Sequence, residues 1–211
     1  MRLVLASNNP GKLAELQSLL APLGLALVAQ GSLGIGEAEE PHASFVENAL
    51  AKARHAARAA NGAAIADDSG LVVDALGGAP GVASAHFAPI ALTSLDREQH
   101  RRTQDAANNA LLLERLRGRH DRGARFVSTL VALRNADDPE PLVATGRWEA
   151  TIAEAPHGEK GFGYDPLVFI DSLGKTVAEL DAAAKNAASH RALAARQMLA
   201  LMRDVWRLGL K

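Results

Sequence analysis

The N-terminal stretch MRLVLASNNPGKLAELQSLL, residues 1–20, sets the expectation for the fold. Residues 2–6 form a short apolar run typical of a buried strand, and leucines then recur at helical spacing from Leu13 to Leu20. Between the strand and the helix lie polar and turn-forming residues, Ser7, Asn8, Asn9, Pro10, Gly11 and Lys12. A strand that leads through a polar turn into a helix is a building unit of α/β proteins, and we expect the chain to begin with one.

The rest of the sequence alternates strand and helix patterns in its first half and looks antiparallel in its second half. Strands are predicted at residues 25–29, 63–66, 126–133 and 142–153, the last two forming a hairpin. Helices are predicted at residues 48–60, behind a capping box at Ser44 and Glu47, at 103–117, and near the C-terminus from Asp181 or Ser189. We therefore expect an α/β fold in which helices flank a mixed β-sheet, in a single domain spanning residues 1–211.

Composition argues against several classes of protein. The net charge is −1 and aromatic residues make up only 4%, whereas proteins that bind polymeric nucleic acid normally carry a basic excess and stacking aromatics. The chain has no cysteine, which rules out disulfides, thiolate nucleophiles and cysteine-bound zinc and suits a reducing cytoplasm. No apolar run approaches the roughly 20 residues that cross a bilayer. We expect a soluble, cytoplasmic protein without a nucleic-acid or membrane partner.

Lys12 is the first candidate for a functional residue. The loop between a parallel strand and the next helix often binds ligands, because a helix N-terminus offers unpaired N–H groups and a partial positive charge. A lysine is unfavourable there unless an anion such as phosphate offsets both charges. The alternative is a surface lysine that reaches into water. The stretch is not a P-loop, since Ala6 and Leu13 replace its first glycine and its hydroxyl residue, so any Mg²⁺ needs carboxylates elsewhere.

The tract Asp67-Asp68-Ser69-Gly70 supplies such carboxylates after the predicted strand at residues 63–66. Adjacent side chains of an extended chain point in different directions, so the two aspartates should have distinct roles, one orienting metal and the other water. The alternative is an Asx turn without function. The acidic loop at residues 31–42 contains Glu37, Glu39 and Glu40, which either add a metal ligand or are simply solvated.

A third candidate is the turn GFGYDP at residues 161–166. Its glycines permit a tight backbone that exposes the aromatic faces of Phe162 and Tyr164, which would suit stacking on a base. The alternative is a turn that packs both rings into the core. Three cationic or titratable groups, Lys185, His190 and Arg191, follow near the start of the last helix, where Ser189 is a plausible cap.

Taken together, these stretches resemble the Ham1-like family of non-canonical purine nucleotide pyrophosphatases. The matching segments are LASNNPGKLAEL (5–16), FVENALAKARHAA (45–57), IADDSGLVVDALGGAPGVASA (65–85), GFGYDPLVF (161–169), KTVAEL (175–180) and KNAASHRALA (185–194). They occur in the family order and span nearly the whole chain. The resemblance implies an elongated mixed sheet flanked by helices, with two lobes around a central nucleotide-binding cleft.

The same resemblance implies an activity. A member of this family would use Mg²⁺ to hydrolyse ITP, dITP or XTP to the monophosphate and pyrophosphate, cleansing the nucleotide pool as a cytoplasmic homodimer. Two rival interpretations are a Maf-like pyrophosphatase that acts on other nucleotides and a nucleotide-binding module without catalysis. Maf-like proteins usually show Ser-x-Ser and arginines after the first strand, where this chain has SNNPGK, and Lys12, Asp67 and Asp68 argue against a silent module.

The resemblance also assigns roles to residues. It places the triphosphate on Ser7, Asn8, Asn9, Pro10, Gly11 and Lys12, and the base on Phe162, Gly163, Tyr164 and Asp165. It makes Asp68 the proton acceptor and a metal ligand, and Ser69 a substrate contact. Lys185, His190 and Arg191 would close on the nucleotide. Glu39 aligns with a second metal ligand, but the family form continues Thr-Gly where this chain has Pro41-His42, which leaves Glu39 and Glu40 both open.

Overall fold

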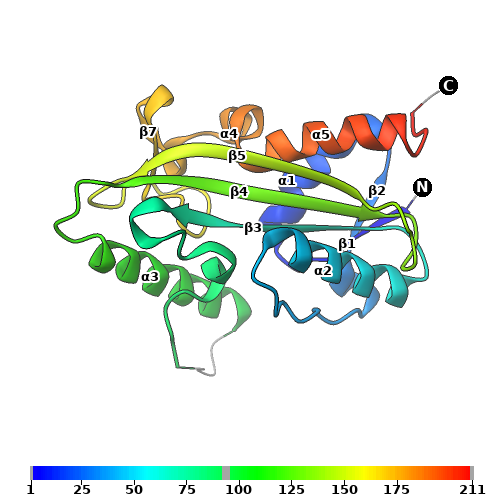
Figure 1. Cartoon of the computed structure of the whole chain (residues 1–211), viewed down its shortest axis with the longest axis horizontal. Helices are drawn as coiled ribbons and strands as arrows, with labels where there is room; N and C mark the ends of the chain where they lie inside the picture. Colours follow the sequence, from blue (N-terminus) through cyan, green and yellow to red (C-terminus); the bar gives the residue numbers. More distant parts are fainter. Residues whose placement is uncertain (1, 92–95, 210–211) are drawn as a thin grey trace. The chain divides into compact units, whose positions relative to one another are not determined.

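The structure is a computed structural model of the chain that describes residues 2–91 and 96–209. Its described strands form one seven-stranded sheet in the order β2-β1-β3-β4-β5-β6-β7 (Figure 1). The strands are β1 (Arg2–Leu5), β2 (Ala26–Ala29), β3 (Ala64–Val73), β4 (Gly123–Leu133), β5 (Leu142–Ile152), β6 (Val168–Ile170) and β7 (Lys175–Thr176). Strand β1 runs parallel to β2 and β3, whereas β6 is antiparallel to β5 and β7. The predicted mixed α/β sheet is confirmed.

The helices are α1 (Pro10–Leu20), α2 (Phe45–Ala60), α3 (Arg97–Arg115), α4 (Ala182–Ala188) and α5 (His190–Asp204). Helix α3 begins six residues earlier than predicted, because Asp96 caps it by accepting the N–H of Gln99 at 2.9 Å. Both predicted starts near the C-terminus are used, since Asp181 precedes α4 and Ser189 caps α5. None of the helices in the described residues is long and apolar enough to span a membrane.

Contacts divide the chain into two compact units. Unit 1 comprises Met1–Ser69, Val127–Arg147 and Asn186–Lys211, and unit 2 comprises Gly70–Phe126 and Trp148–Lys185. Strands β3, β4 and β5 each contribute residues to both units. The chain therefore enters each unit more than once. The organisation of residues 1–211 as a single domain stays a prediction. Its terminal residues 1 and 210–211 lie outside the described structure.

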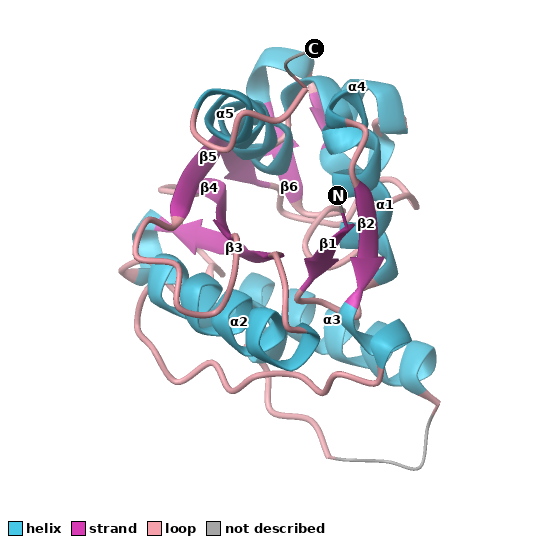
Figure 2. Ribbon diagram, turned by 90° about the vertical axis from the view of Figure 1, so that its right-hand side faces the viewer, coloured by secondary structure: helices cyan, strands magenta, loops and turns pink. Residues whose placement is uncertain are grey.

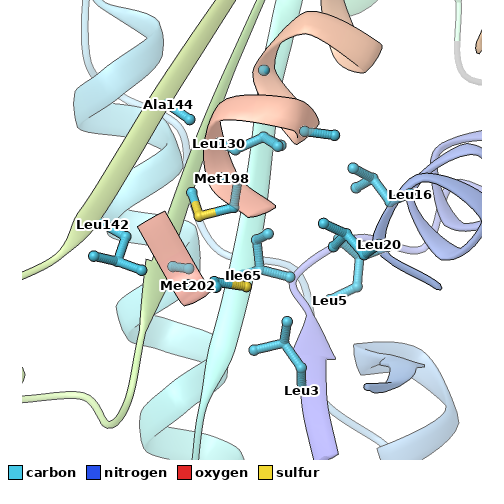
Figure 3. Packing of buried hydrophobic residues seen from close by; sticks show 13 residues of the cluster. Leu3, Leu5, Leu16, Leu20, Ile65, Leu130, Leu142, Ala144, Met198 and Met202 are labelled. Carbon is cyan, nitrogen blue, oxygen red and sulfur yellow. The ribbon is translucent and has the colours of Figure 1, made fainter. Parts of the chain in front are cut away.

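The core of unit 1 follows from the alternation of side chains along β1. Leu3 and Leu5 face a cluster built with α1 and α5, which includes Leu16, Leu20, Met198 and Met202 (Figure 3). Val4 and Ala6 face the opposite side, where they pack against the alanines of α2, Ala49, Ala53, Ala56 and Ala57. Helix α2 thus covers one face of β1 and β3, and α5 lies on the other (Figures 1 and 2).

Strand β3 differs from the prediction in a way that matters for function. Asp67-Asp68-Ser69-Gly70 lies within one continuous strand, Ala64–Val73, and the tract forms neither a strand exit nor an Asx turn. The apolar residues on both sides, Ile65 and Leu71 among them, are fully buried and keep the backbone extended through the polar tract. The two carboxylates are therefore carried into the interior of the protein.

Gly146 of β5 marks a close approach to α5 within unit 1. A Cβ atom built on this residue would lie 1.9 Å from the main-chain oxygen of His190 and 2.6 Å from the nitrogen of Ala194. Both neighbours are backbone atoms of a helix, which cannot rotate aside as a side chain does. Only glycine fits this contact.

We expect Gly146→Ala to lower the free energy of unfolding by about 3 kcal/mol, because α5 would have to shift away from β5. Urea denaturation followed by circular dichroism measures the change. The matched control is Gly36→Ala, where a Cβ meets nothing within 4 Å, and it should stay within about 0.5 kcal/mol of the wild type. Equal stabilities for the two variants would contradict the assigned contact.

Candidate active site

Asp67 is enclosed by hydrogen-bond donors on one face of β3. Its Oδ1 accepts a hydrogen bond from the Ser128 hydroxyl at 2.8 Å, and its Oδ2 accepts one from Nε of Arg191 at 2.9 Å. The Lys12 ammonium lies 3.3 Å from the same Oδ2. Burial alone would raise the pKa of Asp67, but Arg191 and Lys12, with the hydrogen bonds, outweigh it and hold that pKa well below its usual range. Asp67 is thus a permanently charged anchor, with both oxygens engaged.

Asp68 points to the opposite face of β3 and has a different environment. Its Oδ1 lies 2.7 Å from the ammonium of Lys52, which also lies 3.0 Å from Oε2 of Glu40. Burial, together with the charge of Glu40, raises the pKa of Asp68 despite Lys52. Oδ2 of Asp68 is buried and has no hydrogen-bond partner within the described part of the chain. An unpaired buried carboxylate oxygen is costly, so this oxygen, unlike those of Asp67, is a candidate to receive a ligand.

The residues around Oδ2 fit a divalent cation. Mg²⁺ in proteins commonly takes one or two carboxylate oxygens and keeps several waters, so Oδ2 of Asp68 and the carboxylate of Glu40 are candidates for such ligands. No cluster of three or more acidic, histidine or cysteine side chains suited to a metal occurs among residues 2–91 and 96–209. Glu39 and Glu40 are both exposed, but Glu40 shares Lys52 with Asp68. The geometry therefore favours Glu40 over the predicted Glu39.

Lys52 was not identified from the sequence. Burial alone would lower its pKa, but Asp68 and Glu40 outweigh burial and raise it, so the ammonium stays charged between them. One signal could have found it. Lys52 lies beside Ala49, Ala53 and Ala56 on the buried face of α2, and a charged residue on such a face requires an anionic partner.

The start of α1 differs from the expected phosphate site. Oδ1 of Asn9 accepts the N–H groups of both Gly11 and Lys12, at 2.9 and 3.2 Å, and Pro10 has no N–H. The free donors expected at this helix end are therefore already satisfied by the capping residue. Ser7 supports the turn by accepting the N–H of Asn9 at 3.1 Å.

The side chains of this turn are directed to other parts of unit 1. Nδ2 of Asn8 donates to Oε1 of Glu37 at 3.0 Å, which ties the turn to the acidic loop. Nζ of Lys12 donates to the main-chain oxygen of Asp67 at 3.2 Å instead of extending into water. Burial, together with the charges of Arg191 and Lys52, lowers the pKa of Lys12 despite Asp67. The surface-lysine alternative is wrong, and Lys12 is one of the cations that lie next to β3, together with Arg191 and Lys52.

Arg191 is the most fully engaged cation of the site. Its guanidinium donates to Asp67 through Nε, to Glu15 through Nη1 and to the Ser69 hydroxyl through Nη2 at 3.1 Å. The side chain is 2% exposed, so the group acts as a buried clamp on β3 and α1. His190, the first residue of α5, is also buried.

The residues expected at the base gather within unit 2. Oδ2 of Asp165 accepts the N–H of Phe162 at 3.0 Å and pairs with the Lys185 ammonium at 2.9 Å. That ammonium lies 4.8 Å from the centre of the Phe162 ring, within range of a cation–π interaction. Tyr164 is 4% exposed and donates its hydroxyl to the main-chain oxygen of Ser84 at 3.0 Å. Tyr164 therefore anchors the turn, and Phe162, which is half-buried, is the ring that retains an accessible surface.

Fold and site together define an α/β protein whose buried strand carries two carboxylates beside lysines, one with both oxygens paired and one with a buried oxygen that has no partner in the described structure. Such an arrangement is typical of enzymes that act on metal-bound anions. The chain belongs to the Ham1 family, whose model matches residues 3–201.

Similar proteins agree with this assignment. The chain is 69% identical over 206 residues to a dITP/XTP pyrophosphatase of Methylibium petroleiphilum, covering 98% of this chain and 99% of that protein. It is 65% identical to a dITP/XTP pyrophosphatase of Leptothrix cholodnii, with coverage of 99% and 100%. Among solved structures, a HAM1 protein from Coxiella burnetii aligns with a TM-score of 0.85 at 40% identity, covering 97% of this chain and all of that one.

We expect Arg191→Met to lower the free energy of unfolding by about 3 kcal/mol, because it leaves Asp67 and Glu15 without their shared cation. Urea denaturation measures the loss. Arg196→Met, on the same helix but exposed, is the control and should change stability by less than about 0.5 kcal/mol. If Arg191→Met lowers the free energy of unfolding no more than the control does, the stabilising role of Arg191 between β3 and α1 is refuted.

Proposed function

We propose that this chain hydrolyses ITP, dITP and XTP to the monophosphate and pyrophosphate, with Asp68 as the catalytic residue and Mg²⁺ as the cofactor. The class of activity, hydrolysis of non-canonical purine nucleoside triphosphates, follows from membership of the Ham1 family and from relatives named for it. The observation that carries the residue assignment is the contrast between the two aspartates. Asp67 has both oxygens engaged, whereas Oδ2 of Asp68 faces no protein donor in the described structure.

In the proposed reaction a water molecule attacks the α-phosphorus, the bond from that phosphorus to the bridging oxygen breaks, and pyrophosphate leaves. Asp68 accepts the proton that the water loses. Lys52 holds the other carboxylate oxygen, which fixes the orientation of Asp68 during the transfer. Lys12 supplies positive charge where the phosphate oxygens would lie, as a preorganised cation that needs no rearrangement.

Mg²⁺ would be held by Asp68 and Glu40. When bound, it would neutralise negative charge on the phosphates and lower the pKa of a coordinated water. Ser7, Asn8, Asn9, Pro10 and Gly11 are proposed as the triphosphate turn. Because the Asn9 side chain occupies the helix N–H groups, a phosphate bound there must either displace that cap or bind beside it.

Purine selection is proposed to rest on Phe162, Gly163, Tyr164 and Asp165 together with Lys185 and His190. Inosine and xanthine carry an oxygen at C6 where adenine carries an amino group, so donors directed at C6 favour them over ATP. Among the residues of the turn, Phe162 is suited to stack on the base, while Tyr164 positions the backbone. Ser69 and Arg191 hold Asp67 in this structure, and we propose that they act by supporting the site. The homodimer and the cytoplasmic location stay proposals drawn from the family resemblance.

Asp68→Asn tests the assignment of the catalytic residue. We expect it to keep the fold, judged by thermal unfolding, and to lower kcat for ITP by about 10²- to 10⁴-fold because the proton acceptor is lost. Pyrophosphate release with Mg²⁺ is measured across ITP, XTP, dITP, GTP and ATP, which also separates the rival interpretations. Asp121→Asn, an exposed charge change, is the control. Near-normal hydrolysis by Asp68→Asn would overturn the assignment, and no turnover by the wild type would favour a silent binding module.

Glu40→Gln and Glu39→Gln form a matched pair that tests the metal ligand. We expect Glu40→Gln to raise the Mg²⁺ concentration for half-maximal rate about tenfold or more, since losing even an outer-shell partner costs that much. Glu39→Gln, which removes the same charge from the neighbouring residue, should titrate like the wild type. The reverse order of the two variants would return the role to Glu39.

A further inference from the structure

Two side chains of helix α3 form hydrogen bonds with Gly163 in the aromatic turn, which we define as residues 161–166. Asp105 and Asn109 lie one helical turn apart on α3. Oδ2 of Asp105 accepts the N–H of Gly163 at 3.0 Å, and Nδ2 of Asn109 donates to the carbonyl oxygen of Gly163 at 3.0 Å. The φ of Gly163 is +63°, a conformation that other residues rarely adopt. Both polar groups of this glycine are thus fixed by side chains of one helix.

The orientation of Gly163 determines where the adjacent ring lies. Phe162 is its direct neighbour, and the N–H of Phe162 donates to Asp165, which also binds Lys185. Rotation about Gly163 would change the angle of the Phe162 ring and its 4.8 Å distance from the Lys185 ammonium. The Gly163 clamp, formed by Asp105 and Asn109, therefore sets the relative position of the ring and the cation.

Helix α3 is itself held in place, so it can serve as a fixed support. Gln104 donates to the main-chain oxygen of Ala88 at 2.8 Å, and Asn108 accepts the N–H of Ala88 at 2.8 Å. Asn108 also donates to the oxygen of Ser84, the atom that accepts the Tyr164 hydroxyl. Gln104 and Asn108 thus hold α3 in place, and the adjacent residues Asp105 and Asn109 bind Gly163.

Stability alone does not account for the clamp. Oδ1 of Asn109 is buried without a hydrogen-bond partner in the described structure, and such an atom costs free energy. Asp105 is partly buried, and burial raises its pKa despite the Gly163 N–H and Arg101, whose Nη1 lies 3.8 Å from Oδ2 of Asp105. Residues kept at a cost to folding are candidates for a functional role.

We propose that Asp105 and Asn109 are positioning residues for purine selection, which hold Gly163 so that Phe162 and Lys185 present a preformed surface to the base. This rests on the proposed role of the aromatic turn in base binding. A loosened clamp weakens binding of the nucleoside part and leaves the hydrolytic groups on β3 untouched.

The test compares Asp105→Ala, Asp105→Asn and Asn109→Leu with Glu98→Gln, an exposed control on the same helix. For Asp105→Ala we expect KM for ITP to rise about tenfold, the size of a lost hydrogen bond to a charged group, with little change in kcat. Inhibition by inorganic tripolyphosphate, which has no base, should be unchanged. Asp105→Asn should restore KM, because its amide oxygen can still accept the Gly163 N–H. Asn109→Leu should raise KM and supplies the test if Asp105→Ala does not fold.

Three results would overturn the proposal: an unchanged KM in Asp105→Ala and Asn109→Leu, an equal loss of tripolyphosphate inhibition, or no recovery in Asp105→Asn. A wild-type enzyme that releases no pyrophosphate from ITP would instead refute the proposed function. The clamp is then judged by calorimetric binding of IMP, where equal affinities of the wild type and Asp105→Ala would refute it.

Discussion

Two consecutive aspartates in a buried strand cannot share one counter-ion, because their side chains point to opposite faces of the sheet. Each therefore needs its own cation, and the surroundings of β3 provide them. Arg191 and Lys12 serve Asp67 from α5 and α1, and Lys52 serves Asp68 from α2. Three helices distant in sequence are thereby joined to one strand, so the ion pairs of the tract add to the apolar contacts that pack unit 1.

The two aspartates lie in different environments, and their carboxylates differ in how many oxygens are paired. Asp67 is surrounded by donors that stabilise its charge, and this makes it a structural group. Asp68 is neutralised on one oxygen only, which leaves a buried acceptor where a ligand can complete the coordination. A strand that places identical residues on different faces can thus hold a fully paired carboxylate and a carboxylate with one unpaired oxygen at adjacent positions.

Much of this could be predicted from the sequence where local pattern decides structure. The start of α1, the capping of α2 by Ser44 and the hairpin-forming strands were expected from spacing and caps, and the family resemblance supplied the order of motifs. The predictions were wrong where tertiary packing overrides local preference. DDSG is turn chemistry in isolation, but burial on both sides extends it. Lys52 and Asp105 could not be assigned, since their partners at Asp68 and Gly163 are 16 and 58 residues away in the chain.

The alanines of α2 have a further consequence for the chemistry on β3. Ala49, Ala53, Ala56 and Ala57 are short enough to let the helix backbone settle close to the strands. The distance between α2 and β3 matters because a lysine side chain has a fixed length. Lys52 reaches the Asp68 carboxylate only when this distance is small. If leucines replaced these alanines, α2 would lie further from the strands, and the Lys52 ammonium would not reach β3. The small side chains of α2 thus set how far the Lys52 ammonium must reach to arrive at Oδ1 of Asp68.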